Sequence, residues 1–152
     1  METAERSGVP AAQKESDAAI EACIKEAEST TSAEIRVLIA QHERTMTPAE
    51  VEMEAARHFV RLGMTRTPLR NGLLLFVAPS LGHIAVAADE SIRLRLGARI
   101  RATIQRAAEP HLPQYPERAA QAAIRAASKF LTKYFPLSCV DRNDFPDDVI
   151  RC

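Results

Sequence analysis

The hydrophobic pattern of this chain is clearest in its middle, where an uninterrupted apolar run extends from Leu73 to Ala78. No polar residue interrupts this run, so it predicts a strand over residues 72–78 that is covered on both faces, as central strands of α/β sheets are. A short turn, Pro79 to Gly82, leads to a second run, His83 to Ala88. Because the turn is short, the two runs predict an antiparallel hairpin.

A further strand is predicted upstream, over residues 33–40, where apolar residues alternate along one face. Helical spacing of apolar residues follows, with a buried stripe that we expect to end at Leu62. The start of this helix is marked by a capping-box pattern, Thr47 to Glu50. Strand, helix and the strand over residues 72–78 form a βαβ unit, which makes the two strands parallel.

Three more helices are predicted from apolar residues repeated at helical spacing, over residues 11–28, 91–108 and 117–134. The elements together predict an α/β fold, with a mixed sheet built from the βαβ unit and the hairpin and flanked by helices. A length of 152 residues fits one domain. We therefore predict a disordered lead over residues 1–10, a single domain over residues 11–136 and a polar tail over residues 137–152.

The helix predicted over residues 91–108 combines a four-residue apolar repeat with several arginines. The repeat consists of Ile92, Leu96, Ile100 and Ile104, and the arginines on one other face are Arg95, Arg99 and Arg106. We expect that face to be solvated or salt-bridged, since we expect no aromatic residues around it to stack bases. The chain has 20 basic and 20 acidic residues, which likewise argues against a nucleic-acid partner.

Targeting segments and catalytic motifs are not found in the sequence. The apolar runs are far shorter than the ~20 residues of a transmembrane helix, and Met1 to Pro10 does not have the pattern of a secretory signal. We therefore expect a soluble, cytoplasmic protein without a transmembrane segment. Motifs for nucleotide phosphates and for a nucleophilic serine are absent, and the three cysteines lack zinc-site spacing.

Strand directions predict that charged residues from separate loops meet at one end of the sheet. The end of the hairpin lies beside the start of both parallel strands, and the helix after the hairpin begins there. The residues that we expect to converge are Glu34, Arg66, Arg70, Asn71, Asp89, Glu90 and Ser91. The opposite end carries His42, Glu43 and Ser80, which we interpret as ordinary loop residues rather than as an acid–base group.

Three interpretations of the converging residues are open. In the first, Asp89 or Ser91 caps the helix and an arginine pairs with Asp89 or Glu90. In the second, Asn71, Asp89 and Glu90 hold a divalent cation, Ca²⁺ or Mg²⁺, through oxygen ligands. In the third, Arg66, Arg70 and the helix N-terminus bind an anion.

Several segments of the chain together form a recognisable order and spacing. They are Thr31 to Val37, Phe59-Val60, Leu62-Gly63-Met64, Arg66-Thr67, Arg70 to Ala78, Ile84 to Ile92, Tyr134-Phe135-Pro136 and Asp141 to Asp147. Over roughly residues 17 to 149 the chain thereby resembles a TPM domain. The last of these segments is similar to the tail of small bacterial members. The resemblance implies a three-layer α/β/α sandwich.

The resemblance also implies candidate activities at the sheet end described above. Acid-phosphatase activity is associated with plant members of the family and calcium binding with some bacterial ones. The usual family pattern has an acidic residue before Asn-Gly, where this chain has Arg70, and a Gly-Asp-x-Gly turn, where it has Ala88 to Ser91.

We therefore expect a binding or interaction module with a protein partner, or with a peripheral membrane partner as accessory to a membrane process. The alternative is a weak, metal-dependent, phosphatase-like hydrolase.

Overall fold

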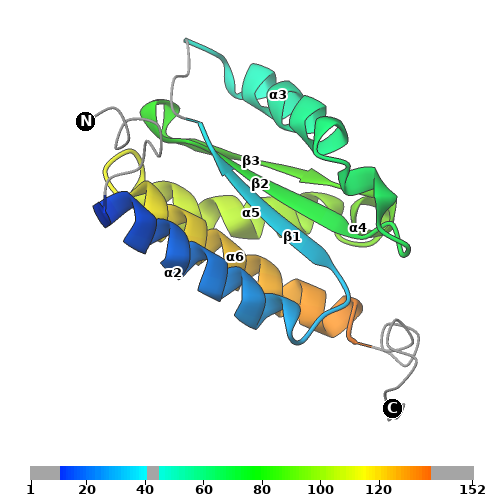
Figure 1. Ribbon diagram of the computed structural model, residues 1–152. Helices are drawn as coiled ribbons and strands as arrows, with labels where there is room; N and C mark the ends of the chain where they lie inside the picture. Colours follow the sequence, from blue (N-terminus) through cyan, green and yellow to red (C-terminus); the bar gives the residue numbers. More distant parts are fainter. Residues whose placement is uncertain (1–10, 41–44, 138–152) are drawn as a thin grey trace.

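The computed structural model describes residues 11–40 and 45–137, which form three layers (Figure 1). The middle layer is a three-stranded sheet in the order β1-β2-β3. Its strands are β1 (Glu34–Ile39), β2 (Gly72–Ala78) and β3 (His83–Ala88). Strand β1 runs parallel to β2, and β3 runs antiparallel to it. The predicted mixed sheet, with its βαβ unit and hairpin, is confirmed.

Helices cover both faces of the sheet, which confirms the α/β/α sandwich. On one face lies α3 (Pro48–Arg61), and on the other lie α2 (Ala11–Glu28), α5 (Gly97–Ala108) and α6 (Pro116–Tyr134) (Figure 1). The shorter elements are α4 (Glu90–Arg95), η1 (Met64–Arg66), η2 (Pro79–Leu81) and η3 (Glu109–His111). The predicted lead, residues 1–10, and the predicted tail beyond Leu137 lie outside the described residues.

Strand β2 forms the centre of the hydrophobic core, because all its residues are buried. Leu73, Leu75 and Val77 pack into the larger cluster, with α2, α5 and α6. Leu74 and Phe76 face the other way and pack against α3. Burial on both faces explains why this strand shows no polar alternation.

The capping box predicted at the start of α3 is confirmed. The Thr47 hydroxyl accepts a hydrogen bond from the Glu50 amide at 3.2 Å, and the Glu50 carboxylate accepts one from the Thr47 amide at 2.8 Å. At the other end, Gly63 adopts a left-handed conformation, with φ of 76°. The prediction that Leu62 ends the buried stripe is wrong: Leu62 is 40% exposed, because it caps the helix where the chain turns away.

The helix predicted over residues 91–108 is interrupted, so that prediction is wrong in one respect. It is two helices, α4 and α5, which meet at Leu96 and Gly97. Gly97 has a φ of 30°, which residues with a side chain rarely adopt, and the helical path breaks there. The four-residue apolar repeat still identified the buried face, since all four of its members are buried. None of the helices in the described part of the chain has both the length and the apolar character needed to cross a membrane.

Candidate functional site

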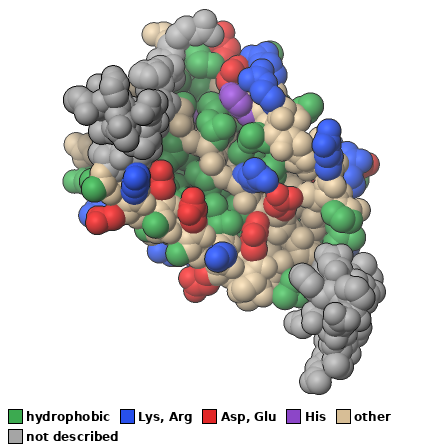
Figure 2. Space-filling view, in the orientation of Figure 1, with side chains coloured by type: hydrophobic (Ala, Val, Ile, Leu, Met, Phe, Trp, Pro, Cys, Tyr) green, Lys and Arg blue, Asp and Glu red, His purple; other side chains and the backbone are tan. Residues whose placement is uncertain are grey.

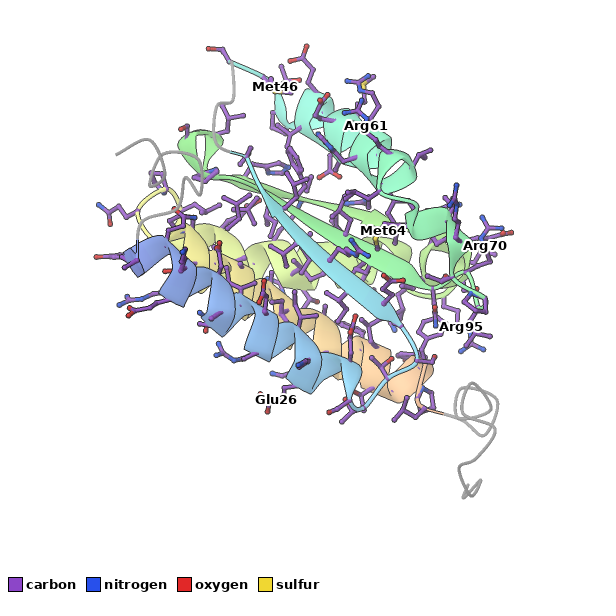
Figure 3. The ribbon with its side chains drawn as sticks, viewed as in Figure 1. Glu26, Met46, Arg61, Met64, Arg70 and Arg95 are labelled. Atoms are coloured by element: carbon purple, nitrogen blue, oxygen red, sulfur yellow. The ribbon has the colours of Figure 1, made fainter. Side chains whose placement is uncertain are left out.

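The loop before β2, the end of β3 and the start of α4 meet at one end of the sheet. The Asp89 amide donates to the Gly72 carbonyl at 3.0 Å, and the Ser91 amide donates to the Arg70 carbonyl at 3.0 Å. Gly72 in turn lies opposite Glu34 of β1. Arg70, labelled in Figure 3, lies at this end. The structure therefore brings these loops together in space.

Arg70 and Asp89 form a two-pronged ion pair at the centre of this group. The Arg70 Nε donates to Asp89 Oδ2 at 2.9 Å, and Arg70 Nη2 donates to Asp89 Oδ1 at 3.0 Å. Asp89 Oδ1 also accepts from the Glu90 amide at 2.7 Å, so Asp89 is the N-cap of α4. Asp89 is only 3% exposed, whereas half of the Arg70 side chain is exposed. The pair therefore fastens the β2 loop to the start of α4.

The ion pair affects the pKa of Asp89, and Arg70 has an unusual backbone conformation. The hydrogen bond from Arg70 lowers the pKa of Asp89 below its ordinary value, although burial alone would raise it. Arg70 has a φ of 52°, a left-handed conformation that costs a residue with a side chain about 1–2 kcal/mol. Such a conformation persists only where surrounding contacts hold it. The ion pair to Asp89 is one such contact.

Asn71 is buried and joins the same loop to β1. Its side-chain amide donates to the Ser32 hydroxyl at 3.0 Å, and its backbone amide donates to the Thr67 hydroxyl at 3.1 Å. The backbone carbonyl of Asn71 accepts a hydrogen bond from the Glu34 backbone amide at 3.4 Å. A buried amide with these partners serves to hold the β2 loop against the start of β1.

The remaining predicted residues lie at the edge of this group. The Ser91 hydroxyl donates to the Leu69 carbonyl at 2.8 Å, which ties α4 to the same loop. Glu90 is exposed, and the Glu34 carboxylate pairs with Arg36 of its own strand at 3.4 Å. Arg66 is exposed and forms no ion pair with any residue of the described ranges. The anion site of Arg66, Arg70 and the helix N-terminus stays a prediction.

Sequence reasoning missed two arginines near Asp89. Arg93 donates through Nε to the Ala88 carbonyl at 3.1 Å, and its charge also lowers the pKa of Asp89. Arg93 and Arg101 line a cavity of about 380 Å³ together with Arg70, Asp89 and Glu52. Arg93 follows Asp89 by four residues and could have been found from helical spacing. Arg101 comes from α5, which only the tertiary fold places there.

The geometry of Asn71, Asp89 and Glu90 can be compared with what Ca²⁺ or Mg²⁺ requires. Both Asp89 carboxylate oxygens accept hydrogen bonds from the Arg70 guanidinium. A cation bound there would have to displace that guanidinium, because hard cations need several free oxygen ligands. Within the described ranges, no group of three or more acidic, histidine or cysteine side chains is arranged to hold a metal ion. The residues do not fit a metal as arranged, and the cation site stays a prediction.

A family model for the TPM domain matches residues 12–132. The chain belongs to the TPM-domain family. Among solved structures it is similar to BA42 from the psychrophilic bacterium Bizionia argentinensis, determined by NMR, with 28% sequence identity and a TM-score of 0.72. The similarity covers 88% of each chain. No curated protein sequence gives a significant match.

In this TPM domain side chains occupy most of the outer edge of β3. Strand β3 bonds to β2 through alternate residues, so the other backbone groups face outward. The outward amide of Ile84 donates to Glu109, and three outward carbonyls accept from side chains. The carbonyls and their donors are Ile84 with Gln105, Val86 with Arg101, and Ala88 with Arg93. Four of the six outward backbone groups of β3 are thereby occupied, while within the described ranges no residue bonds to the outward amides of Val86 and Ala88.

A histidine cluster at the start of β3 adds to these contacts and was not found from the sequence. The His83 Nδ1 lies 2.9 Å from a Glu109 oxygen of η3, and its Nε2 lies 3.2 Å from a Glu52 oxygen of α3. Gln105 also reaches Glu52, at 3.4 Å. The cluster joins both helical layers across the strand. No sequence spacing signals it, because its members come from four different elements.

The outer edge of β1 differs from that of β3. The amides of Glu34 and Ala40 donate to β2, and because backbone direction alternates, those of Ile35, Val37 and Ile39 face outward. The Ile35 amide donates to Glu28 at 2.7 Å. Within the described ranges, no residue bonds to the outward backbone groups of Val37 and Ile39. The free edge of β1 is therefore open over these two residues.

Proposed function

We propose that this TPM domain is a binding module that takes an extended segment of a protein partner along the free edge of β1. The observation that carries the proposal is the contrast between the two edges of one small sheet. Side chains occupy all three outward carbonyls of β3, whereas within the described ranges both the amides and the carbonyls of Val37 and Ile39 on β1 are open. An added strand would pair with the outward amides and carbonyls of Val37 and Ile39. Main-chain pairing of this kind is a common way to recognise peptides.

The surroundings of β1 support a role in selecting the segment. A cavity of about 530 Å³ lies at the start of the strand, lined by residues that include Glu28, Glu34, Arg36, Leu69 and Leu137. Both signs of charge and apolar groups are present there, so one charged side chain of a partner can be held. In Figure 2, hydrophobic side chains gather on the strip between α2 and α3, where β1 lies. An extended segment with alternating apolar residues fits this strip.

The short length of the open edge favours a reversible partner over a permanent dimer. Glu28 already occupies the outward amide of Ile35, which leaves Val37 and Ile39 as the free positions. Stable interfaces bury about 800 Å² on each partner, more than two strand residues supply. The accessory role at a membrane and the cytoplasmic location both stay predictions from the sequence.

The alternative function, a weak phosphatase-like hydrolase, depends on Asp89. Its carboxylate is occupied by Arg70 and by the Glu90 amide, so it would need release before it could hold a metal or act as a nucleophile. Hydrolysis of an aryl phosphate that is lost in Asp89→Asn would support this alternative. Unchanged hydrolysis in that variant would remove Asp89 from it.

Peptides selected from a random displayed library on the folded protein test the proposal. We expect Val37→Pro to weaken binding of the selected peptides at least about tenfold, because proline removes the outward amide that pairs with the peptide. Val37→Thr is the matched control, since it keeps the amide and the β-branched shape, and its affinity should stay within about threefold. Affinity is measured by fluorescence anisotropy of labelled peptides.

Two results would contradict the proposal. One is equal affinity of the selected peptides for wild type and Val37→Pro. The other is self-association of the protein through β1 at the concentrations used, detected by analytical ultracentrifugation, because a second copy would then be the occupant.

A further inference from the structure

Positive charge gathers on α5 and α6 although the whole chain is neutral. Helix α5 has three basic residues and α6 has four, against one acidic residue, Glu117, in the two helices together. The chain as a whole has 20 of each sign. The two helices therefore form a basic surface that is compensated elsewhere in the molecule.

Part of this surface is concave. A groove of about 580 Å³ runs between α5 and α6, and its charged and aromatic lining consists of Arg99, Arg106, Lys129, Lys133, Phe130 and Tyr134. No acidic residue lines it. Within the described ranges, none of its four basic side chains forms an ion pair. Four like charges around one groove repel each other, and a bound polyanion would relieve that repulsion.

Aromatic rings form the other part of the groove, which corrects the expectation that none lies near the arginine face. The Arg99 guanidinium lies 5.8 Å from the centroids of both the Phe130 and Tyr134 rings. Arg99 also donates to the Tyr134 hydroxyl at 3.2 Å, and this bond lowers the pKa of Tyr134. The sequence could not show this, because the rings come from α6 and the arginine from α5. Cations and stackable rings thus share one groove.

We propose that the groove between α5 and α6 binds a nucleoside polyphosphate. Its phosphates lie against Arg106, Lys129 and Lys133, and its base stacks on the Phe130 and Tyr134 rings, where it displaces the Arg99 guanidinium. The volume of the groove is within the range of small-ligand sites, roughly 300–1,000 Å³. Arginine and lysine are the usual partners of phosphate oxygens, and bases stack on aromatic rings. With no carboxylate or histidine in its lining, the groove binds the ligand without a group to hydrolyse it.

The size of the groove distinguishes this ligand from a nucleic-acid strand. Arg99 and Arg106 are seven residues apart on α5, which is about 10 Å along a helix. A strand of several nucleotides would need a longer basic path. The groove residues are separate from those of the β1 edge, so this inference does not depend on the proposed function.

Titration calorimetry with ATP in EDTA, without divalent cations, tests the inference. We expect ATP to bind, inorganic tripolyphosphate to bind about tenfold more weakly and adenosine alone to give no measurable heat. Lys129→Glu should weaken ATP at least about tenfold, because it reverses a charge that faces the phosphates. Arg118→Glu is the matched control, since it makes the same charge change on α6 about 16 Å away, and it should change the affinity less than about twofold.

Amide chemical shifts in the ¹⁵N-labelled protein give the location, and ATP should move those of Thr103 and Phe130. Three results would overturn the inference. They are no binding at millimolar ATP, equal weakening by Lys129→Glu and Arg118→Glu, and tripolyphosphate binding as tight as that of ATP.

Discussion

Replacing Arg70 with alanine is expected to lower the free energy of unfolding by more than the usual ~0.2–1 kcal/mol of an exposed ion pair. The reason is an asymmetry in burial. Arg70 is half exposed, but its partner Asp89 is only 3% exposed and would keep a charge with two of its hydrogen bonds gone. Urea unfolding followed by circular dichroism measures the loss, with the slope m checked for constancy.

Two other substitutions at the same position separate the ion pair from the backbone. Arg70→Gly also removes the pair, but glycine adopts a φ of 52° without strain, so it should be about 1 kcal/mol more stable than Arg70→Ala. Arg70→Lys keeps the charge but cannot form two parallel hydrogen bonds, and it should fall between alanine and wild type. A loss below about 0.5 kcal/mol in Arg70→Ala would mean that the pair does not fasten the loop to α4.

The pH dependence of stability gives a second readout of the same pair. Arg70 lowers the pKa of Asp89 in the folded protein, so the stabilisation is fully present above the ordinary value, 3.8. It is lost as the pH falls through the lower, folded-state pKa. We therefore expect wild type to lose more stability than Arg70→Ala between neutral pH and the acid range, and an equal loss in both would contradict this cause.

Proline at Leu38 is expected to destabilise the protein by roughly 2–3 kcal/mol, whereas proline at the neighbouring Val37 should cost about 1 kcal/mol or less. The alternation of β1 places the Leu38 amide toward β2, so proline there breaks a bond of the sheet and crowds the central strand. The Val37 amide faces outward. Thermal unfolding of the two variants measures the difference, and similar losses in both would mean that the Val37 amide has a partner in the folded protein.

Local sequence signals predicted the elements whose residues determine their own structure. The capping box of α3 is complete within four residues, and the burial of β2 follows from its unbroken apolar run. Strand directions then predicted which loops meet at the sheet end. The break at Gly97 was not predicted, because a glycine in a helical pattern is compatible with an intact helix as well as with a turn.

Contacts between distant elements account for what sequence reasoning missed. Three features of this kind involve residues from different elements. Arg99 contacts Phe130, His83 lies between Glu52 and Glu109, and side chains of other elements bond to the outer edge of β3. Charge type alone cannot predict such contacts, because several arginines of the chain could reach the same carboxylate or ring. The sequence left capping, cation binding and anion binding open at Asp89 for the same reason.

Amide hydrogen exchange along β1 in the free protein shows whether the edge of this strand is open. We expect alternating protection, with slow exchange at Arg36 and Leu38, whose amides face β2, and fast exchange at Val37 and Ile39. The amide of Ile84 on the outer edge of β3 should exchange slowly, since it donates to Glu109 at 3.1 Å. Protection of Val37 and Ile39 equal to that of Leu38 would rule out an open edge, because the edge proposed to receive a partner strand would already be covered.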